Sequence, residues 1–172
     1  MKHLKQILTI FTVALFIFSC NTPERSVGMT AWEGVEDMKW HIGTQSAVDV
    51  AKAMDAAWQA RNYEEMRTYI SDTATLTASN GYTWESVDAF IDRWKMNDSV
   101  WDSNGSTFEW SFTNLFSVDL DPTTGGEHVH ADYYGTFTQD GKADNFRVMN
   151  RYYIIDGKIV MWNSYSQEIV EE

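Results

Sequence analysis

Cysteine, proline and basic residues are all scarce in this chain of 172 residues. It contains 1 Cys and 2 Pro, and its 13 Lys and Arg stand against 25 Asp and Glu. A single Cys excludes a disulfide framework and any Cys-rich zinc or iron–sulfur site. A formal net charge of -12 with scattered basic residues argues against binding through nucleic-acid phosphates, so we expect no nucleic-acid partner.

What the chain has in quantity is apolar and aromatic side chains, which make up 44% and 15% of its residues. This content is ample for a packed core and argues against general disorder. The length fits one globular domain with an appendage, and it is too short for an enzyme with separate cofactor and substrate domains. We expect no cofactor.

The first twenty residues have the pattern of a secretory signal. Lys2 and Lys5 form a short basic head, and an apolar run follows over residues 7–18. That run is too short to cross a hydrocarbon core of about 30 Å, so we interpret it as a signal peptide rather than a membrane span.

The end of this run, Ile17-Phe18-Ser19-Cys20, resembles the lipobox of bacterial lipoproteins. The resemblance implies that residues 1–19 are removed and that Cys20 carries lipid, so the membrane is contacted through that anchor. Asn21 differs from the Asp that resembles an inner-membrane retention signal. The predicted location is therefore the bacterial cell envelope, at the outer membrane.

Residues 20–44 are predicted to be a lipid-anchored tether that becomes structured near its end. The start of this segment has no apolar period, which suits a flexible spacer. Trp32 and Trp40 then appear in polar surroundings, and we expect them to dock on the following domain.

From Thr44 onward the pattern predicts helices followed by strands. An apolar stripe over 47–58 predicts a first helix capped by Thr44 or Ser46, and a short second helix follows over 63–70. A small strand is expected over 73–78. A third helix, which we expect Thr83 to cap, carries the clearest stripe: Trp84, Val87, Phe90, Ile91 and Trp94.

Four long strands are predicted after the third helix, over 107–119, 127–139, 143–156 and 158–167. The pairs Asp140-Gly141 and Asp156-Gly157 between them are typical of tight hairpins. These patterns predict an α+β domain in which three helices cover an antiparallel meander.

Several segments together resemble a nuclear transport factor two-like, or SnoaL-like, domain. They are residues 57–63, 74–77, 87–94 and 151–160. The resemblance implies a domain over 45–172, with a cone-shaped curved antiparallel sheet and about three N-terminal helices packed on its concave face. It also implies one hydrophobic cavity, of the kind that hosts isomerases, cyclases, epoxide hydrolases, dehydratases and plain binders.

The strand over 127–138 alternates between an apolar face and a titratable face. If the titratable face lines the cavity, His130 is a candidate base oriented by Asp132, and Tyr165 is a candidate for polarising a substrate oxygen. If that face points outward, these residues are solvent-exposed. A third alternative pairs His128 with His130 on a metal, although no fourth ligand is evident.

The remaining site predictions concern the ligand pocket and partners. The candidate pocket residues are Trp58, Trp84, Phe90, Trp94, Trp110, Tyr134, Arg151 and Asn163. The helix-borne aromatics could equally be simple core. Apolar groups on both faces of the last two strands predict that a second copy covers the sheet in a homodimer, or that the Trp32–Trp40 segment covers it.

These observations favour two functions of different classes, and a third remains as a weaker alternative. The first is a lipid-anchored domain that binds a small, largely apolar molecule without turning it over. The second is an isomerase, cyclase or hydrolase that uses His130 and Asp132. The third is an interaction module that recruits another envelope protein through its sheet.

Overall fold

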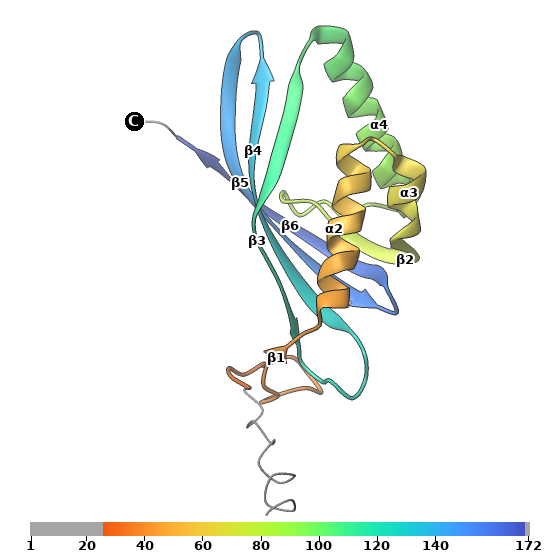
Figure 1. Cartoon of the computed structure of the whole chain (residues 1–172), viewed down its shortest axis with the longest axis vertical. Coiled ribbons are helices and arrows are strands. Elements are labelled where there is room, and N and C mark those ends of the chain that lie inside the picture. The colour runs from red at the N-terminus through yellow and green to blue at the C-terminus, as the bar shows by residue number, and fades with distance from the viewer. Residues whose placement is uncertain (1–25, 171–172) are drawn as a thin grey trace, which may run out of the picture.

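The computed structural model describes residues 26–170 and shows three helices on one side of a strongly curved six-stranded sheet (Figure 1). The elements are β1 His41–Ile42, α2 Gln45–Gln59, α3 Tyr63–Thr68, β2 Ile70–Thr77, α4 Val87–Asn104, β3 Thr107–Asp119, β4 Glu127–Gln139, β5 Lys142–Ile155 and β6 Lys158–Ile169. The predicted α+β class and helix-then-strand order are therefore confirmed. Cys20 and the predicted signal peptide lie outside the described residues.

Side-chain caps set where each helix begins. Thr44 accepts a hydrogen bond from the backbone N–H of Ala47 and starts α2, as predicted. The expected cap of α4 at Thr83 is wrong. Thr83 instead forms an isolated β-bridge with Thr77, and Ser86 accepts from the N–H of Ala89. Trp84 consequently precedes the helix.

The predicted meander is confirmed, because β3, β4, β5 and β6 pair antiparallel in sequence order. Asp140-Gly141 and Asp156-Gly157 both have positive φ at the two positions, as tight hairpin turns require. The sheet is not wholly antiparallel, however. β2 pairs in parallel with β6 at one edge, since the chain reaches that edge directly from α3 before it builds the meander.

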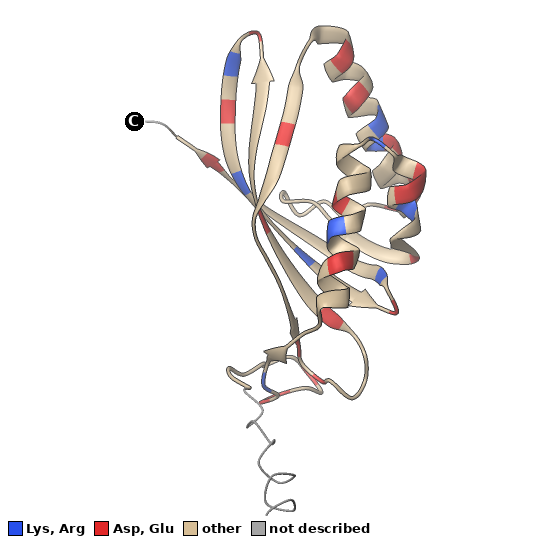
Figure 2. Ribbon diagram, in the orientation of Figure 1, with Lys and Arg blue, Asp and Glu red and all other residues tan. Residues whose placement is uncertain are grey.

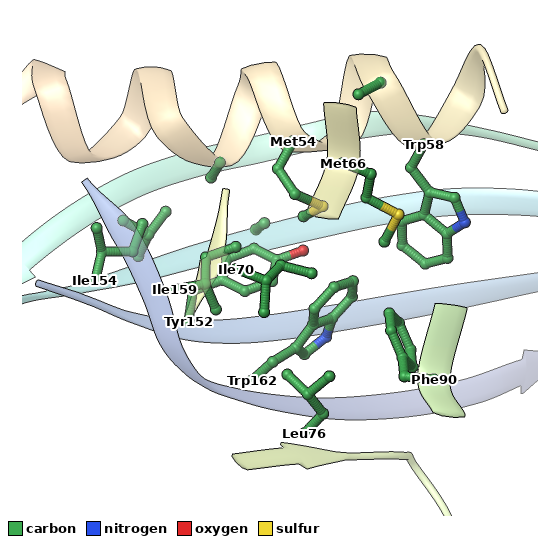
Figure 3. Close-up of a cluster of buried hydrophobic side chains, with 14 of the residues drawn as sticks. Met54, Trp58, Met66, Ile70, Leu76, Phe90, Tyr152, Ile154, Ile159 and Trp162 are labelled. Atoms are coloured by element: carbon green, nitrogen blue, oxygen red, sulfur yellow. The ribbon is translucent and has the colours of Figure 1, made fainter. Parts of the chain in front are cut away.

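The core lies between the helices and the concave face of the sheet (Figure 3). Met54 and Trp58 of α2 and Met66 of α3 meet Tyr152 and Trp162 of the sheet there, and all five are buried. Charged residues are frequent along the helices and near the strand ends, and a few lie within the strands (Figure 2). Among residues 26–170 no helix combines the length and hydropathy needed to cross a bilayer.

The segment before α2 packs against the convex face of the sheet. Its strand β1 pairs with β3 at the sheet edge, and Val27 bridges Trp40. The rings of Trp32 and Trp40 lie 5.7 and 5.2 Å from that of His128. The predicted docking of these two tryptophans is thus confirmed.

Candidate functional site

An apolar cavity of about 570 Å³ opens between α4, the β2–α4 loop and the concave face of the sheet. This size lies within the range of about 300–1,000 Å³ typical of small-molecule sites. Its walls come from α2, β2, α4 and all four strands of the meander.

The inner wall is built on the ring of Trp58. Trp94, Trp110 and Trp162 surround it, with ring centroids 4.6, 5.1 and 5.3 Å away. Edge-to-face and tilted packing of this kind holds each ring in one orientation. The wall is therefore rigid, apolar and rich in π surface.

A directed chain of hydrogen bonds runs along this wall from β6 to α2, and several of its members line the cavity themselves. The indole N–H of Trp162 donates to Ser164 Oγ (3.0 Å), and Ser164 donates to Asn150 Oδ1 (2.7 Å). Asn150 Nδ2 then donates to the hydroxyl of Tyr152 (3.1 Å), which lies 3.2 Å from that of Tyr133. Each polar side chain in this hydrogen-bonded series therefore has a partner, as its burial demands.

Asp55 of α2 is the final acceptor. Trp110 Nε1 donates to its Oδ1 (2.9 Å), Gln59 Nε2 donates to its Oδ2 (2.8 Å), and Tyr133 also hydrogen-bonds to it. Its side chain is buried, and this burial raises the pKa of Asp55 above its ordinary value despite the three donors. Burial likewise raises the pKa of Tyr133, which stays a neutral donor.

The rim of the cavity is polar, and most of its side chains have no hydrogen-bond partner within the described residues. Ser79 and Asn80 from the β2–α4 loop, Arg93 and Asn97 from α4, and Ser166 from β6 line it. Among residues 26–170 the side chains of Ser79, Arg93, Asn97 and Ser166 have no hydrogen-bond or ion-pair partner.

The same architecture recurs among solved structures of small α+β proteins. An LEH-like epoxide hydrolase from M. tuberculosis superposes with a TM-score of 0.57 at 14% identity, over 72% of this chain and 84% of that one. The candidate polyketide cyclase IdmH from Streptomyces antibioticus gives 0.57 at 13% identity, over 72% and 93%. The chain has the nuclear transport factor two-like fold.

A further structure with this fold is the beta subunit of the benzoate 1,2-dioxygenase from Burkholderia mallei. Its TM-score is 0.59 at 11% identity, and the match covers 73% of this chain and 91% of that one. No family model and no curated protein matches the sequence. At identities this low, the superpositions establish the nuclear transport factor two-like fold alone, and the site must be argued from its own residues.

Five of the predicted pocket residues line the cavity, namely Trp58, Trp84, Phe90, Trp94 and Trp110. Tyr134, Arg151 and Asn163 are not among its lining residues. Each follows or precedes a cavity-side residue on its strand, so its side chain points to the convex face. Arg151 there lies over the rings of Trp32 and Trp40, 5.2 and 6.0 Å from their centroids.

The titratable face of β4 also points away from the cavity. His130 stacks on the ring of Phe116 with centroids 5.0 Å apart, and Asp132 accepts a hydrogen bond from Asn114 (3.3 Å). Asp132 and Tyr165 share a separate hollow on the convex face, whose lining does not include His130. The structure therefore does not bring the three predicted catalytic residues together at the aromatic cavity.

The ring of His128 packs against other aromatic rings and is not placed to bind a metal. Its ring stacks on Tyr153 at 4.5 Å between centroids and contacts the two docked tryptophans. Burial, together with the smaller effects of the nearby Arg151 and His130, lowers the pKa of His128 to about 4. Within residues 26–170 no three His, Cys, Asp or Glu side chains converge as a metal site would require.

The convex face keeps several large side chains in contact with solvent, namely Phe116, Tyr134, Met149 and Tyr165. They come from β3, β4, β5 and β6, the strands on which the homodimer was expected to form. The dimer stays a prediction.

Most of the polar residues of the site were not predicted from the sequence: Asp55, Arg93, Tyr133, Asn150 and Ser164. One signal was available for Asp55, because it directly follows Met54 inside the buried stripe of α2, where a carboxyl needs partners. Asn150 and Ser164 likewise interrupt apolar strand faces. Their convergence depends on the strand register, which pairs Asn150 with Ser164.

Proposed function

We propose that this protein binds a small, largely apolar molecule in its aromatic cavity, and that a lipid on Cys20 holds it at the outer membrane of a bacterium. The observation that carries the proposal is the cavity of about 570 Å³ built around Trp58 and Trp162. Solved structures of this fold are named for reactions of small organic molecules, including an epoxide hydrolase. A similar ligand class is therefore a reasonable expectation here.

We further propose that binding occurs without turnover. The polar groups along the wall, from Ser164 to Asp55, satisfy one another, so they leave no free base for a substrate. The predicted catalytic residues His130 and Asp132 lie on the other face of the sheet.

An enzyme of the isomerase, cyclase or hydrolase kind is the second candidate function. The observation that favours it is Asp55, a buried carboxyl of raised pKa joined to Tyr133 at the cavity. Such an acid could exchange a proton with a ligand through the tyrosine hydroxyl. Recovery of a bound ligand in chemically altered form would favour this candidate over the binder.

A neutral fluorescent probe tests the binding function. N-phenyl-1-naphthylamine is expected to bind once per chain with a micromolar Kd, with enhanced emission from the apolar wall. Val148→Trp places a large ring on the cavity side of β5 and should weaken binding at least tenfold. Met149→Trp, on the opposite face of the same strand, is the matched control and should bind normally. Equal binding by both variants would refute the cavity as the site.

Mass spectrometry of the protein extracted from bacterial membranes tests the anchor. The mature chain is expected to begin at Cys20 and to carry the added mass of acyl chains, because a single chain would exchange from the membrane. A Cys20→Ser variant should appear in the soluble fraction without that mass. An unmodified Cys20 in the membrane-extracted protein would contradict the lipid anchor.

A further inference from the structure

Arg93 is a cation on the cavity rim whose charge is not neutralised by the protein. Two nearby arginines are paired: Arg61, in the turn between α2 and α3, with Asp98 and Asp102, and Arg67 of α3 with Asp72 and Asp88. Among residues 26–170 Arg93 has neither an ion pair nor a cation–π contact, although aromatic rings surround the cavity that it lines.

The helical spacing explains why Arg93 stays unpaired. Neighbours on the surface of an α-helix stand three or four residues apart, and around Arg93 these are Ala89, Phe90, Met96 and Asn97. None of them is a carboxylate. The acidic residues of α4 therefore lie on other sides of the helix, and Asp88, Asp98 and Asp102 are bonded to other arginines.

The rest of the rim adds hydrogen-bonding capacity beside this charge. Asn97 lies one helical turn beyond Arg93 and, with Ser79, also lines the cavity without a side-chain partner among the described residues. A guanidinium presents N–H donors in a planar fork that matches carboxylate and sulfonate oxygens. In the aromatic wall behind the rim, the indole N–H groups of Trp110 and Trp162 are already paired.

We infer that the ligand is an organic anion, with an apolar body inside the cavity and a carboxylate or similar group bound to Arg93 at the rim. The inference rests on the proposed binding function and specifies its ligand class. The chain as a whole repels anions, since its net charge is -12. A local unpaired Arg is thus the feature that makes this cavity suitable for one.

Two probes that differ by one charged group test the inference. 8-Anilinonaphthalene-1-sulfonate and N-phenyl-1-naphthylamine share the same aromatic body, and only the first carries a sulfonate. Arg93→Gln is expected to weaken sulfonate binding about five- to tenfold and to leave the neutral probe within about twofold. Arg93→Lys should keep most of the sulfonate affinity, because the positive charge remains.

Arg147→Gln provides the matched control. Arg147 is an exposed arginine on the convex face that also lacks an ion-pair partner among residues 26–170, so the substitution changes the net charge equally. Arg147→Gln should leave the affinity for both probes unchanged. Rising salt should weaken sulfonate binding to the native chain and have little effect on the neutral probe.

The outcomes separate this inference from the function on which it rests. If neither probe binds the native chain, or if Val148→Trp weakens neither, the binding cavity itself is refuted. If both probes bind in the cavity and Arg93→Gln weakens the sulfonate no more than Arg147→Gln does, the cavity stands and the anion site at Arg93 is refuted.

Discussion

Replacing Asp55 with alanine is expected to lower the free energy of unfolding by about 3–5 kcal/mol. The substitution removes the acceptor of the half-buried indole N–H of Trp110 and leaves the buried hydroxyl of Tyr133 with Tyr152 as its remaining hydroxyl partner, whereas the exposed amide of Gln59 can turn to water. Each buried donor without a partner carries a desolvation cost of about 1–3 kcal/mol. Urea denaturation of the two proteins at pH 7 measures the difference.

Asp55→Asn is the control that keeps the side-chain shape and loses the charge. It retains one acceptor and should cost only about 1–2 kcal/mol at neutral pH. The raised pKa of Asp55 sets the sign of the pH dependence. The native state favours the protonated acid, so this stabilisation is present at low pH and is lost as the pH rises through the raised pKa.

The penalty of Asp55→Asn relative to the native chain should therefore be larger at pH 4 than at pH 8. A penalty that grows with pH would show that the native fold stabilises the ionised carboxylate instead. An Asp55→Ala variant as stable as the native chain would show that the hydrogen-bond chain along the cavity wall does not contribute to folding.

Acidification from pH 7 to pH 4 is expected to remove about 3 kcal/mol of stability through His128 alone. Burial against Tyr153 and the docked tryptophans, with Arg151 and His130 nearby, lowers the pKa of this imidazole from 6.5 to about 4. The folded state therefore disfavours its charged form. The stabilisation is complete above pH 6.5 and is lost as the pH falls through 4.

His128→Phe preserves an aromatic ring at this position and removes the titration. Both proteins lose stability between pH 7 and pH 4, and we expect the loss in the variant to be smaller than that in the native chain by about 3 kcal/mol. Urea denaturation at several pH values measures the two losses. His130→Gln, which alters the neighbouring and more exposed imidazole, should keep the larger share of the pH dependence. Parallel pH profiles for His128→Phe and the native chain would contradict this account.

The fold was largely predictable because its signals are local. Each of these signals is formed by residues close together in the sequence. They are the stripe over 47–58, the two Asp-Gly turns and the alternation along the four long strands. The errors arose where distant partners decide the outcome. Thr83 looked like a helix cap, yet its bridge to Thr77 removes it from the helix, and the parallel pairing of β2 with β6 joins segments about 90 residues apart.

The site was less predictable, for the same physical reason. Alternation along β4 showed that His130 and Asp132 share a face and that Tyr133 lies on the other, but not which face looks into the cavity. The helices decide this by covering the apolar face. Only that packing places Tyr133 beside the cavity and His130 on the convex surface.

By itself, the amino-acid sequence determined the α+β class, the order of helices and strands, the hairpin turns and the aromatic residues available for a cavity, because these follow from local periodicity and turn chemistry. Only the tertiary structure decided that Asp55, Asn150 and Ser164 form one hydrogen-bond chain and that Arg93 stands unpaired at the rim. Such contacts depend on strand register and helix packing, which bring residues from different elements together.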